Sequence, residues 1–284
     1  MIKTKMVINI HRPPIAYFGQ KWALYEWIKD YLPIHSERVD LFGGGGAFST
    51  LLPPCDRHVW NDLYKPSVNF FRVLKADPDA LIQNINNLLD GLTLDELKQC
   101  CKQFKISDLE PEQQAARFYL NSHLSFAQTG TQAHTGWTTD NRKLSQDYLN
   151  PTYLWAVAAR WRSIQIYNLD FRQMLTQTPA TMFVYADPPY VWSCRKSKDS
   201  RHPNSDRPCR KYAHELGDAD HVELIRLLQG RPVLLSGFWS ELYADCVPRD
   251  WQIVSKRIQS DEIEYLWISP EAWERQQQLK LELA

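Results

Sequence analysis

Short apolar runs at regular intervals are the main pattern of this chain. The runs that predict strands are five or six residues long and lie at 38–42, 58–62, 164–169, 181–186 and 232–236. Helix-favouring stretches separate them, at 21–32, 47–52, 66–74 and 221–228. Strands that alternate with helices are typical of a mostly parallel sheet. The pattern predicts an α/β fold with a mostly parallel sheet, flanking helices and a terminal antiparallel strand pair at 253–258 and 264–268.

The middle of the chain lacks this alternation. From about 77 to 150 the apolar residues recur at helical spacing, as at Leu81, Ile85 and Leu88, and no segment favours a strand. Residues 122–141 are mostly polar or small, so we expect an exposed loop there. The pattern predicts one domain formed by 1–76 and 151–284, with 77–150 inserted as a helical subdomain.

The sequence Asp187-Pro188-Pro189-Tyr190 directly follows the strand expected at 181–186. Each proline lacks an N–H and fixes φ at about −65°, so the chain must leave the sheet here. In open α/β sheets, ligands bind at the carboxyl ends of the strands. A carboxylate, a backbone carbonyl and an aromatic ring at that edge are suited to holding a planar amine. A proline-rich surface turn is the alternative.

Four consecutive glycines, Gly43–Gly46, follow the first expected strand. Glycine permits positive φ and close approach of a ligand to the backbone. The run matches neither G-x-G-x-x-G nor G-x-x-x-x-G-K-[ST], which favours an adenosine-type cofactor without phosphates. Asp62 and Asp170 end two other expected strands, where carboxylates can bind ribose hydroxyls or an adenine amino group. A flexible turn and two helix caps are the alternatives.

Charge and cysteine content narrow the function classes. The 33 basic and 33 acidic residues cancel, so no net charge attracts nucleic acid to the whole chain. Residues 193–211, however, contain seven Lys or Arg against two Asp. The six cysteines have no metal-ligand spacing, so we expect no metal. We find no signal-peptide, lipidation or transmembrane pattern and expect a cytoplasmic protein.

Several motifs together resemble the Dam-like family of DNA adenine-N6 methyltransferases of bacteria and phages. The matching pieces are Tyr17–Lys21, Asp40–Gly45, Asn61-Asp62, Asp170-Phe171, Asp187–Tyr190 and Tyr212–Leu228. They occur in that family's order and cover most of the chain. The resemblance implies an enzyme with a Rossmann-like catalytic domain, a target-recognition subdomain at 77–150 and double-stranded DNA as substrate.

The resemblance also implies S-adenosyl-L-methionine as methyl donor. The implied cofactor contacts are Tyr17, Lys21, Asp40, Phe42, Gly43, Gly45, Asp62, Asp170, Phe171 and Asp187. Tyr17 and Lys21 would line the methionine side. Asp62 would bind the ribose hydroxyls, and Asp170 with Phe171 would hold the adenine.

Catalysis is assigned by this resemblance to Asp187, Pro188, Pro189 and Tyr190. The exocyclic amine of adenine is a poor nucleophile because its lone pair is delocalised into the ring. Asp187 and the Pro188 carbonyl would each accept one amino hydrogen and aim the lone pair at the methyl group. The target lies inside the duplex, so the base must be flipped out, and Tyr190 is the expected stacking surface.

DNA contacts are expected in two segments. Phosphate contacts are expected from Arg195, Lys196 and Lys198. Base contacts are expected from Ser125, Gln128, Gln132, His134 and Arg142. A mobile loop that becomes ordered only on DNA is the alternative for this stretch. Residues 120–130 agree with GATC-methylating members at Ser125 and Phe126 but lack the Asn-Gly that follows there, so the target sequence is left open.

Three alternatives keep part of this picture. The first two keep the methyl-transfer chemistry and change the substrate to an RNA adenine or a protein amide. Amide-methylating relatives, however, usually carry Asn where this chain has Asp187. A DNA-binding protein of this fold without catalysis is the third, and the intact acids and Tyr190 argue against it. We expect a monomer that serves a restriction-modification system or a phage.

Overall fold

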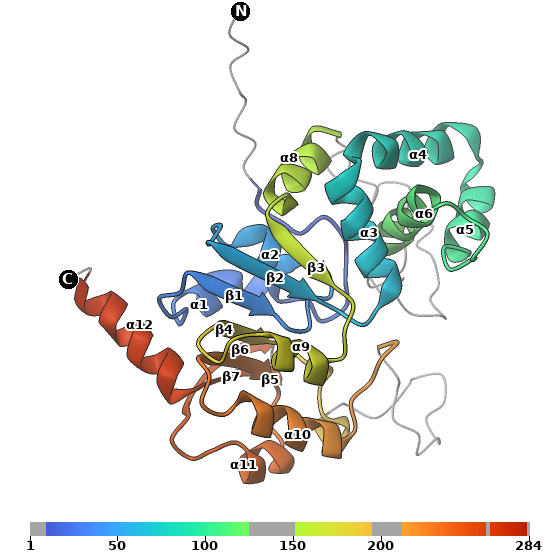
Figure 1. The fold of residues 1–284 in the computed structure, drawn as a ribbon. Coiled ribbons are helices and arrows are strands. Elements are labelled where there is room, and N and C mark those ends of the chain that lie inside the picture. Colours follow the sequence, from blue (N-terminus) through green and yellow to red (C-terminus); the bar gives the residue numbers. More distant parts are fainter. Residues whose placement is uncertain (1–9, 125–150, 195–211, 260–261, 283–284) are drawn as a thin grey trace, which may run out of the picture. The chain divides into compact units, whose positions relative to one another are not determined.

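The computed structural model describes residues 10–124, 151–194, 212–259 and 262–282, which include a seven-stranded sheet (Figure 1). The strands are β1 (Glu37–Asp40), β2 (Arg57–Asn61), β3 (Ile164–Tyr167), β4 (Phe183–Ala186), β5 (Val233–Gly237), β6 (Gln252–Gln259) and β7 (Glu262–Ile268). Their order in the sheet is β3-β2-β1-β4-β5-β7-β6. β1 pairs in parallel with β2 and β4, and β4 with β5, whereas β7 runs antiparallel to β5 and β6. The predicted α/β fold is confirmed.

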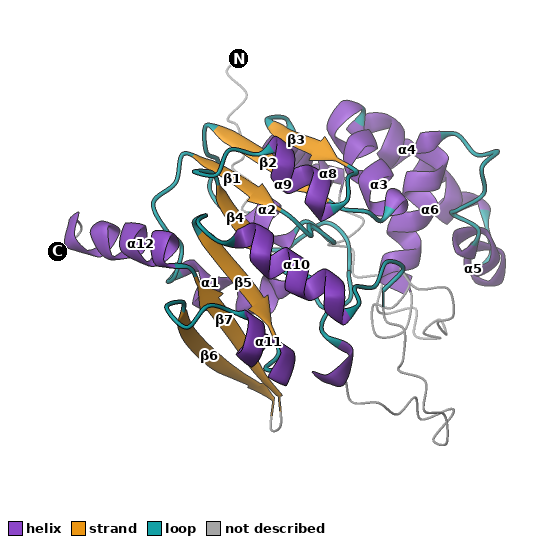
Figure 2. Cartoon of the chain, turned by 60° about the horizontal axis from the view of Figure 1, so that its bottom comes forward, coloured by secondary structure: helices purple, strands orange, loops and turns teal. Residues whose placement is uncertain are grey.

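Burial on both faces explains the continuous apolar sequences of the central strands. Every residue of β4 and β5 is buried, as expected for parallel strands covered by helices. One face packs against α9 (Phe171–Gln177), α10 (Asp218–Leu228) and α11 (Glu241–Cys246), which lie in a row in Figure 2. Elsewhere, Gln276 Nε2 of α12 (Pro270–Glu282) donates to the carbonyl oxygen of Asp30, the residue that ends α1 (Tyr25–Lys29), at 2.9 Å.

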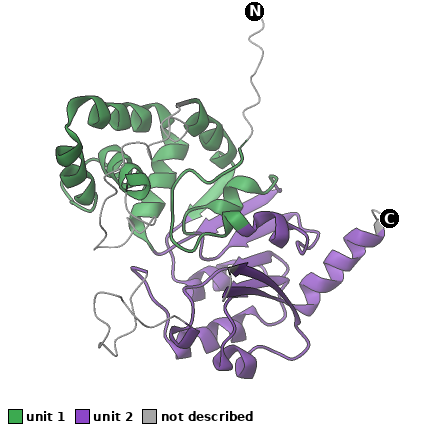
Figure 3. Cartoon of the chain, turned by 180° about the vertical axis from the view of Figure 1, so that it is seen from behind, with its two compact units in different colours: residues 1–23, 44–54, 64–166 green, residues 24–43, 55–63, 167–284 purple. Residues whose placement is uncertain are grey.

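The chain divides into two compact units (Figure 3). The first contains residues 1–23, 44–54 and 64–166, and the second contains 24–43, 55–63 and 167–284. The helices of the first unit are α2 (Ala47–Leu51), α3 (Lys65–Ala76), α4 (Pro78–Gly91), α5 (Leu94–Lys102), α6 (Pro111–Leu124) and α8 (Pro151–Trp161). No described residue from 77 to 124 lies in a strand. The assignment of 77–150 to a target-recognition subdomain stays a prediction.

Stacked aromatic rings form the core of the first unit. Phe70 stacks on Tyr119 with ring centroids 5.8 Å apart, and Phe71 stacks on Trp161 at 3.8 Å. Trp161 Nε1 also donates a hydrogen bond to Thr50 Oγ1 (3.0 Å). These contacts join α3 to α6 and α8, and α8 to α2.

Some short elements differ from the sequence expectation. The helix expected at 21–32 is a 3-10 turn (Lys21–Leu24) followed by α1, and another 3-10 turn occupies Trp192–Cys194. The sequence pattern did not reveal α9 and α11, because helices of seven and six residues are too short to show an apolar stripe. It also missed α12, whose buried face includes the polar Gln276.

We predict that Trp161→Ala lowers the free energy of unfolding by about 3–5 kcal/mol, because it removes a fully buried ring and leaves a cavity. The matched control is Trp155→Ala on the same helix, where the ring is 47% exposed and the expected loss is about 1 kcal/mol or less. Urea unfolding followed by circular dichroism measures both. Equal losses for the two variants would contradict the packing described above.

Candidate functional site

The carboxyl end of β4 carries the Asp187–Tyr190 motif. The Ser236 hydroxyl donates a hydrogen bond to Asp187 Oδ1 (3.0 Å). Ser236 is fully buried on β5, the neighbouring parallel strand, in which Leu235 pairs with Ala186. The sheet therefore fixes one oxygen of the Asp187 carboxylate through a side chain outside the motif.

Tyr190 is fixed at its hydroxyl end. The hydroxyl donates to the Glu264 carboxylate, 3.0 Å from Oε2 and 3.1 Å from Oε1, and the ring contacts Phe238 with centroids 4.4 Å apart. Glu264 is 1% exposed, whereas Tyr190 keeps part of its surface exposed. Burial of the hydroxyl, and then the nearby Glu264 and Asp187 carboxylates, raise the pKa of Tyr190 well above its usual value. The hydroxyl therefore stays protonated and remains a donor.

The buried side chain of Asn61 joins three chain segments at the strand ends. Its amide nitrogen donates to the carbonyl oxygens of Leu41 (3.1 Å) and Leu169 (2.9 Å). Its amide oxygen accepts a hydrogen bond from the Leu169 N–H (2.9 Å). The residues that follow on these segments are three of the predicted cofactor contacts, namely Phe42, Asp62 and Asp170. One amide thus positions three segments that are distant in the sequence.

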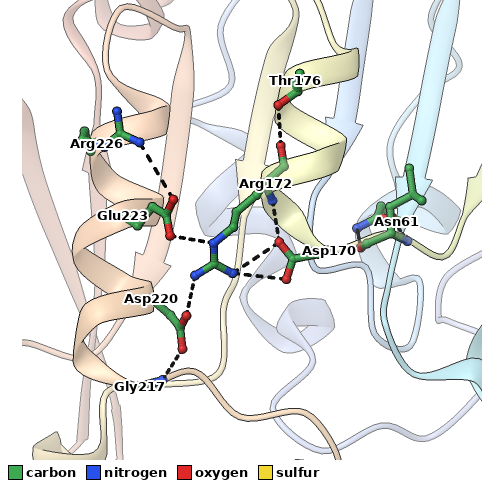
Figure 4. A network of polar contacts seen from close by, with 9 residues as sticks. Asn61, Asp170, Arg172, Thr176, Gly217, Asp220, Glu223 and Arg226 are labelled. Atoms are coloured by element: carbon green, nitrogen blue, oxygen red, sulfur yellow. Dashed lines mark hydrogen bonds and ion pairs between the residues drawn. The ribbon is translucent and has the colours of Figure 1, made fainter.

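The guanidinium of Arg172, near the start of α9, binds three carboxylates (Figure 4). Asp170 caps the helix by accepting from the Arg172 N–H (2.9 Å), and the guanidinium contacts both Asp170 oxygens (3.3 and 3.2 Å). The same guanidinium binds Glu223 (2.6 Å) and Asp220 on α10. These carboxylates raise the pKa of Arg172, and the Gly217 N–H followed by Arg172 lowers the pKa of Asp220. Because 34% of its side chain is exposed, Asp170 is both a helix cap and an accessible acceptor.

Two aromatic residues meet beside Asp170. The rings of Phe42 and Phe171 have centroids 5.9 Å apart, and the Arg172 guanidinium carbon lies 4.3 Å from the centre of the Phe171 ring. Phe171 is 2% exposed, whereas Phe42 is partly exposed. The structure brings these two predicted cofactor contacts together and leaves Phe42 the more accessible one.

Asp40 points away from this group. Its neighbours Val39 and Leu41 belong to the core beneath α9 and α10, so alternation along β1 turns Asp40 to the other face. Asp40 is 2% exposed there, with Oδ2 3.6 Å from His58 Nε2, and Arg38 Nη2 lies 3.1 Å from His58 Nδ1. Asp40 belongs to a buried charged cluster, and its contact with a cofactor stays a prediction.

Close packing accounts for the glycine run. A Cβ on Gly43 would lie 2.0 Å from the Trp60 ring, and a Cβ on Gly45 would lie 2.6 Å from Tyr17. Gly46 has a φ of +69°, which strains other residues. The run is glycine because the chain's own rings lie against it. Contacts of Gly43 and Gly45 with a cofactor stay a prediction.

Tyr17 and Lys21 belong to the first unit. A Cβ on Gly44 would lie 3.2 Å from the Tyr17 ring, and Ser67 Oγ donates to the Gly44 carbonyl oxygen (2.6 Å). Lys21 is 5% exposed, and its Nζ donates to the Gly19 carbonyl oxygen (2.9 Å). Within this unit, Tyr17 and the second half of the glycine run lie together.

The structure also adds residues that the sequence did not indicate. They are Arg172, Ser236, Phe238 and Glu264. Phe238 follows β5 as Tyr190 follows β4, and an aromatic residue at a strand end is a signal that could have revealed it. The predicted DNA contacts Ser125, Gln128, Gln132, His134, Arg142, Arg195, Lys196 and Lys198 lie outside the described residues.

Other side chains bind two of the strand-end acids. Asp187 accepts from Ser236, and Asp170 pairs with Arg172.

Among the residues that the structure describes, no three His, Cys, Asp or Glu are grouped so that they could hold a metal ion. In the same ranges, no helix has both the length and the apolar character needed to cross a membrane.

Comparison with known proteins agrees with the motifs. No curated protein matches the chain. The family model for D12 class N6 adenine-specific DNA methyltransferases matches residues 17–202, which is more than half of the 284 residues. The match begins at Tyr17 and includes the Asp187–Tyr190 motif, so the resemblance to adenine-N6 methyltransferases is confirmed. The chain therefore belongs to the D12 class N6 adenine-specific DNA methyltransferase family.

Proposed function

We propose that this DNA adenine-N6 methyltransferase takes its methyl group from S-adenosylmethionine and acts on an adenine flipped out of duplex DNA. The arrangement at the end of β4 carries the proposal. Ser236 fixes the Asp187 carboxylate, while Glu264 and Phe238 fix the Tyr190 ring. A fixed carboxylate beside a partly exposed aromatic residue is suited to a planar amine.

Residues at the other strand ends fit this cofactor chemically. Asp62 and Asp170 offer partly exposed carboxylates, which suit ribose hydroxyls and an adenine amino group. Phe42 and Phe171 offer ring surface beside Asp170. When bound, S-adenosylmethionine would supply an electrophilic methyl group. We propose further contacts from Tyr17, Lys21, Asp40, Gly43 and Gly45.

Asp187 is proposed to act through its carboxylate, which Ser236 holds at Oδ1. We propose that this carboxylate accepts one adenine amino hydrogen. The Pro188 carbonyl oxygen would accept the other. With both hydrogens bound, the nitrogen lone pair is aimed at the methyl group, and this positioning supplies much of the rate acceleration.

Tyr190 would act through its ring rather than through its hydroxyl. The hydroxyl points to the buried Glu264 carboxylate, whereas part of the side chain is exposed. Stacking of a base on an aromatic ring contributes about 1–3 kcal/mol. That gain offsets part of the cost of removing an adenine from the duplex, which is a few kcal/mol.

DNA binding is proposed for two segments outside the described residues. The phosphate contacts would come from Arg195, Lys196 and Lys198. Base readout would come from Ser125, Gln128, Gln132, His134 and Arg142, within the proposed target-recognition subdomain at 77–150. The target sequence is open, and methylation-aware sequencing of DNA from cells that express the protein would identify it.

We predict that Asp187→Ala lowers the rate of methyl transfer by about a hundredfold or more, because the adenine amine loses a fixed acceptor. Transfer of a labelled methyl group from S-adenosylmethionine to unmethylated duplex DNA measures the rate, and calorimetry shows whether cofactor binding survives. Asp250→Ala, at an exposed carboxylate, is the matched control and should keep the wild-type rate. Wild-type activity in Asp187→Ala would overturn the mechanism, and no transfer by the wild type would overturn the proposed function.

We further predict that Ser236→Ala lowers kcat about tenfold, because a hydrogen bond to a charged group contributes about 1.5–3 kcal/mol. The control is Ser240→Ala, which removes the cap of α11 at a stability cost of about 1 kcal/mol. Its kcat should be unchanged, since Ser240 caps α11 through the Tyr243 N–H. Equal kcat values in the two variants would show that Ser236 does not position Asp187.

A further inference from the structure

Glu264 is a buried carboxylate on strand β7. It is 1% exposed and lies on the face of β7 that also carries Glu262 and the fully buried Leu266 and Ile268, opposite Lys256 of β6. Removing a carboxylate from water is costly even when it is paired. Apolar residues in place of such a buried pair often stabilise a fold as well or better. A carboxylate buried at this position therefore needs partners, and the Tyr190 hydroxyl is one of them.

Strand register brings Glu264 to the end of β5. Strand β7 runs antiparallel to β5, with Leu266 opposite Ser236. Glu264 lies two residues before Leu266, so it shares a face with Ser236 and lies beside the residues that follow β5. From there its two carboxylate oxygens lie 3.0 and 3.1 Å from Tyr190 Oη.

The Tyr190 ring is thereby restrained at three places. Its backbone follows the two prolines, its ring contacts Phe238, and its hydroxyl is bound by Glu264. A tyrosine side chain has two rotatable bonds before the ring. The hydrogen bond at the far end restrains rotation about the first, and the ring contact with Phe238 restrains rotation about the second, whose axis passes through the hydroxyl oxygen. Tyr190 as a whole residue is partly exposed, whereas Glu264 is buried.

We propose that Glu264 is a positioning residue for methyl transfer, which, together with the Phe238 contact, holds the Tyr190 ring in the place that receives the flipped adenine. The inference rests on the proposed stacking role of Tyr190. Glu264 acts through the Tyr190 hydroxyl and does not touch the base. A ring that is already oriented loses no conformational freedom when the base stacks on it, so the reactive geometry is populated more often.

The test compares Glu264→Leu, Glu264→Gln, Tyr190→Phe and the double variant Tyr190→Phe/Glu264→Leu. Each is assayed for labelled methyl transfer to unmethylated duplex DNA and for its melting temperature. Glu264→Leu and Tyr190→Phe should each lower kcat about tenfold, with the KM for S-adenosylmethionine within about twofold of the wild type. Glu264→Gln should restore most of kcat, because its amide oxygen can accept the same hydrogen bond.

The double variant separates positioning from a structural role. If Glu264 acts through the hydroxyl, the double variant should have the kcat of the single variants, not a hundredfold loss. Its melting temperature should be no lower than that of Glu264→Leu, because both substitutions remove the same hydrogen bond. A kcat loss that does not grow in the double variant, with no added loss of stability, is a result that a role elsewhere in the fold does not produce.

Several outcomes would overturn the inference. A wild-type kcat in Tyr190→Phe or in Glu264→Leu would overturn it. If Glu264→Leu does not fold, the kcat of Tyr190→Phe is sufficient to test the inference. Multiplying losses in the double variant would show that Glu264 acts elsewhere. Glu241→Leu, at an exposed carboxylate on α11, is the control and should match the wild type. Absence of transfer by the wild type would reject the proposed function as well, whereas active wild type with unaffected variants rejects this inference alone.

Discussion

The hydrogen bonds of the Asn61 side chain hold together the part of the molecule on which the candidate cofactor residues depend. A single buried amide binds the carbonyl oxygens of Leu41 and Leu169 and the N–H of Leu169. Because a buried amide is costly when its groups are unpaired, these three bonds define one arrangement of the strand ends. This arrangement sets the positions of the next residue on each segment, namely Phe42, Asp62 and Asp170.

The direction of β7 has a comparable effect at the other end of the site. In a wholly parallel sheet, the strand beside β5 would bring its own carboxyl end to this edge. Since β7 is antiparallel, the first half of the strand lies there instead, and it contributes Glu264. Ser236 and Glu264 thus reach Asp187 and Tyr190 from two adjacent strands on one face of the sheet. The Asp187–Tyr190 motif is short, and side chains from strands that come later in the chain hold Asp187 and Tyr190 in place.

The glycine run and Asp170 show that a residue expected to bind a ligand can have a structural reason for its type. Sequence patterns favoured a ligand beside Gly43–Gly46, and the neighbours found there are Trp60 and Tyr17. Asp170 is a helix cap, as its position before α9 requires, and it also keeps an accessible carboxylate. The surroundings of a residue, rather than its type, separate the two uses.

The sequence by itself determined the strands, the motif at the end of β4 and the family. Each of these is a pattern of residues close together in the chain, and recognising it requires no knowledge of tertiary contacts. Apolar runs such as 181–186 predict buried strands. The two prolines end β4 whatever strands lie beside it in the sheet. Only the tertiary structure decided what fixes Asp187 and Tyr190. Ser236 and Glu264 come 49 and 74 residues after Asp187 and Tyr190 in the sequence. The presence of a serine or an acid on a later strand does not indicate which residue it contacts. Sheet order and strand direction create these pairs, and neither is encoded in the spacing of the residues that they bring together.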